Sequence, residues 1–241
     1  MKRNLLCIIF LCCTAAVVLF AAESWQKKPY TAWDVKDIQK IMNDSPWARK
    51  VDIVIGALRG QDDMPRSSSP VAGAGNIGGA GGAGGRGGDM SGPGSTFHGN
   101  PMVRFVVCFI SALPVKQAMM RAKYGDAVGS SPEANKVLST PDNYYVVGLT
   151  GLRGLPPGDA QAINKAIKEK STLQVKGKEP FGPVQVVMDS TMIALFFPRE
   201  GHPIALEDGE VEVQVQVPNL PQTIRRKFAL KEMVFNGKLE L

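Results

Sequence analysis

The sequence predicts an α+β fold in which a central strand with flanking helices is followed by a C-terminal antiparallel β-meander. Two observations lead to this prediction. Apolar residues recur at helical spacing in several segments up to Lys170, whereas from Leu173 onward they alternate with a period of two. The run Met102–Ser111 is almost continuously apolar, which is typical of a central strand covered on both faces. The 241 residues contain no internal repeat of the length that builds solenoids.

The first segment, residues 1–24, has the order of features found in a secretory signal peptide. Two cations precede the apolar run Leu5–Phe20, and small residues follow it. We expect cleavage after Ser24, because Ala22 and Ser24 then place small side chains at both positions read by the peptidase. The alternative is an uncleaved N-terminal anchor, since Leu5–Ala22 is long enough to span a bilayer. The leader therefore predicts a secreted or periplasmic protein.

Residues 25–61 are expected to form an N-terminal helix and a first strand. Within Trp25–Lys50 the apolar residues have helical spacing, and Asp34 is placed to cap the helix. The neighbouring tryptophans are expected to anchor this helix to the body of the protein. Val51–Leu58 is apolar and rich in β-branched residues, which favours a strand.

Residues 62–100 predict a disordered linker rich in Gly, Ser and Pro. Half of the 26 glycines lie between Gly73 and Gly99, and the tract carries too little apolar surface to offset its chain entropy. The stretch Gly73–Gly78 matches a dinucleotide-binding fingerprint by letter. We interpret that match as accidental, because no strand precedes it and no helix follows it.

Residues 101–241 are expected to form an α+β domain that shares one core with residues 25–61. Three amphipathic stretches predict helices, and the methionines in the first of them, Met119 and Met120, are expected to fill the core. The predicted helices are Leu113–Tyr124, Ser131–Leu138 and Asp159–Lys170, and Tyr144–Leu149 is predicted as a strand between the second and third.

The C-terminal part is expected to be antiparallel. Asp189-Ser190-Thr191 lies between two apolar runs and predicts a tight hairpin, and Asn236-Gly237 predicts a second. Four valines alternate with polar residues along 211–217, as in a strand with one buried face. The segment Thr223–Leu230 can return antiparallel to it.

The residues that commonly carry catalysis are few. His98 falls in the linker and His202 in a turn, so no histidine pair has metal-ligand spacing. After loss of the leader Cys108 is the sole cysteine, and its apolar neighbours favour a buried thiol over a nucleophile. We therefore assign no catalytic, cofactor-binding or metal-binding residue, and we expect no cofactor.

Carboxylates remain as candidates for acid–base chemistry or calcium binding. Two of them at a suitable separation could hydrolyse a glycosidic bond, although turns and helix caps are the simpler interpretation. Arg225-Arg226-Lys227 is interpreted as a solvated strand face opposite Glu212, and not as an anion site. The candidate carboxylates are Asp37, Asp44, Asp159, Glu207, Asp208, Glu210 and Glu212.

Several short motifs resemble those of a group of exported, uncharacterised bacterial proteins. The resemblance covers most of the chain outside the linker, and it implies export and a bacterial origin without an activity. The motifs are Pro29-Tyr30 with Trp33, Asp44-Ser45-Pro46-Trp47-Ala48, Ser111-Ala112-Leu113-Pro114-Val115, Phe197-Pro198-Arg199 and Gly237-Lys238-Leu239-Glu240-Leu241.

The function expected from the sequence is a non-catalytic binding or structural module of the cell envelope. A carboxylate-dependent hydrolase and a membrane-anchored form of the same domain are the alternatives. The net charge of +6 is modest and its cations are dispersed, so nucleic acid is not an expected partner. Another envelope protein or a glycan is the partner class that this function would require, with membrane contact only through an uncleaved leader.

Overall fold

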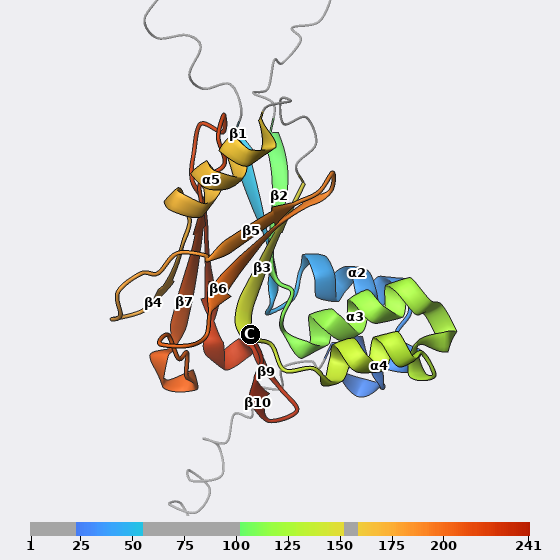
Figure 1. The fold of residues 1–241 in the computed structure, drawn as a ribbon. Coiled ribbons are helices and arrows are strands. Elements are labelled where there is room, and N and C mark those ends of the chain that lie inside the picture. Colours follow the sequence, from blue (N-terminus) through green and yellow to red (C-terminus); the bar gives the residue numbers. More distant parts are fainter. Residues whose placement is uncertain (1–22, 55–101, 152–158) are drawn as a thin grey trace, which may run out of the picture.

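The computed structural model describes residues 23–54, 102–151 and 159–241, which form two antiparallel sheets and a helical lobe (Figure 1). The larger sheet has the strand order β1-β2-β3-β6-β5 and the smaller one β4-β7-β8. The larger sheet contains β1 Ala48–Val54, β2 Met102–Phe109, β3 Tyr144–Thr150, β5 Gln185–Met188 and β6 Met192–Pro198. The smaller sheet contains β4 Thr172–Val175, β7 Glu210–Val215 and β8 Ile224–Ala229, and the hairpin of β9 Val234–Phe235 and β10 Lys238–Leu239 follows.

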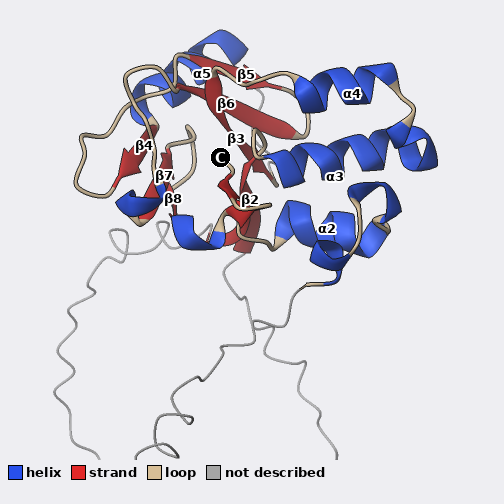
Figure 2. Ribbon diagram, turned by 90° about the horizontal axis from the view of Figure 1, so that it is seen from below, coloured by secondary structure: helices blue, strands red, loops and turns tan. Residues whose placement is uncertain are grey.

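Three helices form a lobe beside the larger sheet, and a fourth lies near β5 at the other end of the described structure (Figures 1 and 2). The helices of the lobe are α2 Val35–Asn43, α3 Leu113–Tyr124 and α4 Pro132–Ser139, and the other is α5 Ala160–Lys170. Side chains cap three of these helices: Asp34 caps α2, as the sequence predicts, Ser131 caps α4 and Asp159 caps α5. Asp34 accepts hydrogen bonds from the main-chain N–H groups of Lys36 and Asp37, and Asp159 accepts one from that of Gln161.

The first helix is shorter than the sequence suggests. Instead of one helix from Trp25, the chain makes two 3₁₀ turns, η1 Ser24–Lys27 and η2 Tyr30–Ala32, before α2 begins. Pro29 separates the turns, and Lys28 before it is extended, with φ −136° and ψ 152°. A proline disfavours the helical conformation in the residue that precedes it, which explains the break.

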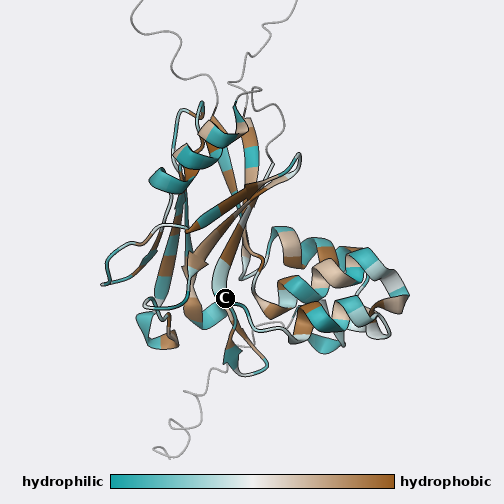
Figure 3. Ribbon diagram, in the orientation of Figure 1, coloured by the Kyte–Doolittle hydropathy of each residue, from teal (hydrophilic) through white to brown (hydrophobic). Residues whose placement is uncertain are grey.

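The two sheets share one hydrophobic core. Phe109 of β2 meets Phe228 of β8 edge to face, with ring centroids 5.0 Å apart, and Phe181 meets Phe197 in the same way at 6.0 Å. Buried and half-buried residues alternate along β7, whereas β2 and β6 at the centre of the larger sheet are mostly hydrophobic (Figure 3), and the buried residues of both sheets belong to one core. Residues of the N-terminal segment, Ile53 among them, belong to this same core.

The α+β fold with C-terminal antiparallel strands is confirmed. The valines at 211, 213, 215 and 217 are all at most 1% exposed, whereas the intervening Glu212 and Gln214 are half-buried. The antiparallel strands are, however, divided between the sheets. The β5–β6 hairpin extends the larger sheet through β3, whereas β7 pairs with β4 on one side and with β8 on the other.

Tryptophan side chains anchor the N-terminal segment, as expected from the sequence. Trp25, Trp33 and Trp47 are each 1% exposed. The Trp25 ring lies edge-on to Trp33 and Trp47 and also contacts Phe235 in β9. The Trp47 indole N–H donates to the main-chain oxygen of Glu240, 2.9 Å away. The two ends of the described chain are thus joined through one aromatic cluster.

Some expectations concern residues that the structure does not describe. These are the leader up to Ala22, the linker 62–100 with His98, and the strand residues after Val54. Among the described residues, no helix has the length and apolar character needed to cross a membrane.

Candidate functional site

Apart from Glu207, the carboxylates singled out from the sequence take part in caps and ion pairs. Asp159 caps α5, Asp44 pairs with Lys40 at 3.0 Å, and Asp208 pairs with Lys178 at 2.8 Å. Within the parts of the chain that the structure describes, no group of three or more His, Cys, Asp or Glu side chains is placed to hold a metal ion.

The pKa shifts also argue against an acid–base pair. Hydrolysis by two carboxylates needs one of them protonated at working pH, which requires a raised pKa. Hydrogen bonding to Lys40 lowers the pKa of Asp44, and hydrogen bonds from the main chain of Ala205 and from Lys178 lower that of Asp208. All carboxyl groups with a shifted pKa in the described residues have it lowered, namely Asp34, Asp37, Asp44, Asp52, Asp189 and Asp208.

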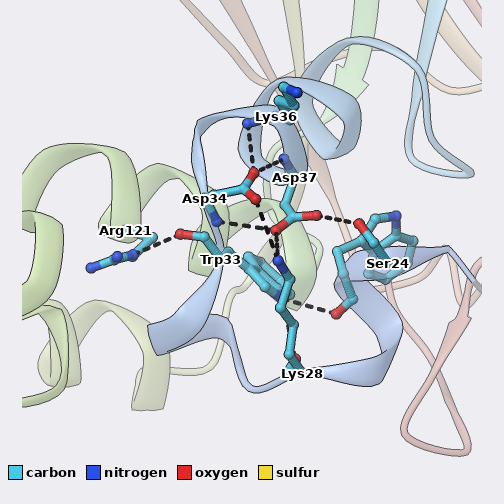
Figure 4. Close-up of polar contacts among 8 residues, drawn as sticks. Ser24, Lys28, Trp33, Asp34, Lys36, Asp37 and Arg121 are labelled. Carbon is cyan, nitrogen blue, oxygen red and sulfur yellow. Dashed lines mark hydrogen bonds and ion pairs between the residues drawn. The ribbon is translucent and has the colours of Figure 1, made fainter.

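Asp37 is the one buried carboxylate among these candidates, and it holds the N-terminal segment in place (Figure 4). Ser24 Oγ donates to one of its oxygens, and Lys28 Nζ and the main-chain N–H of Asp34 contact the other. Burial acts to raise the pKa of Asp37, but the hydrogen bonds from Lys28 and Ser24 outweigh it and lower the pKa.

The Ser24, Lys28 and Asp37 group does not form a nucleophile with its base. The hydrogen bond to Asp37 raises the pKa of Lys28, which keeps the ammonium charged. A lysine that activates a serine must be neutral, and here Ser24 already donates its proton to the carboxylate. We therefore interpret the group as a structural clasp between the first 3₁₀ turn and α2.

His202 and Cys108 occupy structural positions. The His202 ring stacks on Phe181 with centroids 4.0 Å apart and an interplanar angle of 9°, and both residues line a hollow of about 340 Å³. Cys108 is buried, as predicted, and burial raises the pKa of its thiol to about 12. Such a thiol is a poor nucleophile because almost none of it is ionised at neutral pH.

The basic triplet of β8 is exposed, in agreement with its interpretation as a solvated strand face. Lys227 lies opposite Glu212 in the strand register and pairs with Glu210 at 2.9 Å. Arg225 and Arg226 are exposed beside it.

A groove runs from the outer face of the larger sheet, beside α3 and α4, to the residues around β10. It consists of two adjoining hollows of about 520 and 430 Å³, which we call the charged hollow and the apolar hollow. Their shared lining residues are Ser111, Lys116, Thr140 and Asp142.

The charged hollow is built where α3 begins and the chain ends. The first-turn residue Lys116 of α3 reaches Asp142, with Nζ and Oδ2 2.7 Å apart. The N–H of Leu113 donates to Glu240 Oε2 at 3.3 Å. Arg199, after β6, donates to the main-chain oxygens of Tyr144 and Leu241. The side chains of Lys116, Asp142, Arg199 and Glu240 are therefore held in place by the protein itself.

The apolar hollow has the sheet as its floor and the helices as its walls. Val146 of β3 and Phe196 of β6 are cross-strand partners on the face turned away from the shared core. Met119 and Met120 of α3 and Val137 of α4 complete the lining. Val137 is 42% exposed although it is aliphatic, so the hollow offers an apolar contact surface to solvent.

Sequence reasoning missed this groove. Met119 packs against the core, as expected, and also lines the apolar hollow, whereas Met120 is half-buried and lines the hollow without belonging to the core. Adjacent residues on a helix point about 100° apart, so Met120 lies to the side of the face that Met119 turns to the core, and this was the available signal. The pairing of Lys116 with Asp142 left no signal in the sequence, because it depends on how the α4–β3 connection packs on α3.

No protein-family model, curated protein or solved structure matches this chain. The resemblance to exported bacterial proteins therefore stays an expectation from the sequence, and the site has to be interpreted from its own geometry.

Proposed function

We propose that this protein is an exported, non-catalytic binding module of the bacterial cell envelope and that the groove is its binding surface. The observation that carries the proposal is the junction of a charged and an apolar hollow through shared residues. Ligand sites combine apolar contact area with a few fixed polar groups, and this groove has both. Export rests on the leader at residues 1–24.

The groove is better suited to binding than to hydrolysis, which is the alternative. It contains two carboxylates, but Asp142 pairs with Lys116 and Glu240 accepts from the main chain of Leu113. Each carboxylate therefore already has a partner within the protein, so neither is free to donate a proton to a ligand in the hollow. If the groove were hydrolytic, the purified protein would release fragments from envelope glycan, and Asp142→Asn or Glu240→Gln would abolish the release.

Photo-crosslinking in the native host tests the binding surface. A photoreactive amino acid is placed at Val137 in the groove or at Lys168, which is exposed on α5 far from it. We expect a discrete adduct from position 137 and none from position 168. Equal labelling at both positions, or at neither, would show that the groove is not the binding surface.

Export is tested by fractionating cells of the native host and measuring the intact mass of the chain. An exported, processed chain should be recovered outside the cytoplasm with an intact mass that begins at or near Trp25. A start at Glu23 would retain the hydrogen bond from Ser24 to Asp37, whereas a start at Trp25 would remove it, so the mass decides between the two. Full-length chain confined to the membrane fraction would favour the anchored alternative.

A further inference from the structure

We infer that the groove binds a segment of a partner protein in which aliphatic side chains are flanked by acidic ones. This inference rests on the proposed function and adds the class of ligand. It is carried by the residues that line the apolar hollow, by its exposure at Val137 and by cations that form no ion pair with the described residues.

The apolar hollow favours aliphatic side chains of a polypeptide. It is lined by Met119, Met120 and Val137 from the helices and by Val146 and Phe196 from the sheet. Methionine side chains are flexible and polarisable, so they adapt to side chains of different shape. The hollow opens to solvent at Val137, which is unlike the enclosed cavity that a free acyl chain requires.

A glycan fits this lining less well. Sugar rings stack on exposed aromatic faces, and Phe196 is the aromatic residue in the described lining of the two hollows. Its ring is packed edge-on against Tyr144, with centroids 6.0 Å apart and an interplanar angle of 85°. The remaining apolar lining is aliphatic or thioether, which suits leucine, isoleucine or valine side chains.

The rim of the groove carries cations that the described protein does not neutralise. Lys136 lines the apolar hollow and Lys238 lines the charged hollow, and neither forms an ion pair with a described residue. Lys116 and Arg199 lie in the charged hollow as well, whereas its acidic side chains are Asp142 and Glu240. The side chains of the groove thus have an excess of positive charge, which is complementary to an acidic segment.

Peptide selection tests this inference on the intact protein. A random peptide library displayed on phage is panned against the wild-type chain, with the Val137→Glu variant used for counter-selection. We expect enriched peptides to contain aliphatic residues next to Asp or Glu. Their affinity should fall as salt is raised, because exposed charge pairs are screened.

Matched variants assign the binding to the groove. Lys136→Glu and Lys238→Glu should each weaken binding about 3- to 10-fold, because the attraction between an exposed lysine and an acidic residue of the peptide becomes a repulsion between two carboxylates. Lys168→Glu on α5 should have no effect. Val137→Glu should weaken binding about tenfold or more, whereas Val35→Glu, at a residue that is 68% exposed on α2, should leave it unchanged.

Three results would overturn the inference. These are enrichment of basic or uncharged peptides, equal binding by the groove variants and their controls, and no enrichment at all. An adduct of position 137 with a glycan, a lipid or the chain itself would also overturn it. In the glycan and lipid cases the groove would still be a binding surface, so the proposed function would survive.

Discussion

At the scale of single residues, the buried carboxylate of Asp37 holds the N-terminal turn against α2. Asp37 is 3% exposed and is surrounded by Ser24, Lys28 and the start of α2. A buried carboxylate is tolerated only when hydrogen bonds and an opposite charge replace its hydration. The clasp therefore makes the N-terminal turn depend on the ionisation of one side chain.

Asp37→Asn should lower the free energy of unfolding by about 1–3 kcal/mol at pH 7, because charged hydrogen bonds to a buried group are lost. The folded-state pKa of Asp37 is lowered, so its contribution is present above the ordinary pKa of about 4 and is lost as the pH falls through the folded-state value. The difference between wild type and variant should therefore shrink in acid. Denaturant melts at neutral and acidic pH measure it, and Asp126→Asn, at a side chain that is 98% exposed, is the control.

Cys108 should react slowly in the folded protein. Burial raises the pKa of its thiol to about 12, so the thiolate is scarce. We expect alkylation of Cys108 by iodoacetamide at mildly alkaline pH to be at least about 100-fold slower in the native than in the denatured chain. Mass spectrometry of the peptide that contains Cys108 follows the reaction, and similar rates in both states would contradict the burial.

At the scale of secondary-structure elements, β7 is the central strand of the smaller sheet, and its three buried valines form part of the shared core. It pairs with β4 on one side and β8 on the other, and its valines face the larger sheet. Each buried valine contributes about 1.5–3 kcal/mol by transfer from water. Loss of this strand would remove the face on which the larger sheet packs.

Val213→Asp should prevent folding or cost more than about 3 kcal/mol, because an unpaired carboxylate would have to be buried. Gln214→Asp, one residue along on the half-buried face, should cost less than about 1 kcal/mol. Denaturant melts of the two variants compare the faces directly. Equal tolerance would show that the assignment of the buried face is wrong.

Gly151 follows β3, and a side chain there would destabilise the fold in two ways: through its backbone conformation and through a collision. Its φ is +97°, and a Cβ there would collide with the main-chain oxygen of Arg104. Gly177 has a φ of +77° with open space around it. Gly177→Ala should therefore cost about 1 kcal/mol, and Gly151→Ala at least about 2 kcal/mol more. Thermal melts measure both, and equal losses would refute the collision.

At the scale of the whole molecule, segments far apart in the sequence pair with one another and share one core. All seven residues of β1 pair with β2, although the linker separates the two strands in the sequence. The indole of Trp47 and the main chain of Glu240 are 193 residues apart in the sequence and share a hydrogen bond. The core therefore does not depend on an intact connection between β1 and β2.

Brief trypsin treatment should cut the linker near Arg66 or Arg86 and leave two fragments that remain together. The strand pairs between β1 and β2 and the shared aromatic cluster should hold them. Size-exclusion chromatography followed by denaturing electrophoresis measures the association. A variant with glutamine at both positions should resist these cuts. Separation of the fragments under native conditions would contradict the expectation.

Most helices and strands could be predicted from the sequence, because their signals are local. The alternating valines of β7 mark its buried face, Asp34 and Asp159 cap helices, and Asn236-Gly237 forms the last hairpin turn, with φ of 50° and 76°. Each of these features involves residues only a few positions apart, so the backbone itself brings them together. The cap at Asp34 marks the start of α2, whereas the two 3₁₀ turns on either side of Pro29 were not predicted.

The tertiary structure alone decided which strands share a sheet and where the groove lies. No signal in the β5–β6 hairpin indicates that it joins β3, and none in β7 that it joins β4. Similarly, Leu113 and Glu240 meet in the groove across 127 residues of sequence. Such contacts depend on the packing of whole elements, in which many alternative pairings have similar local energies. Sequence therefore determined the elements and their buried faces, and packing determined the sheets and the candidate site.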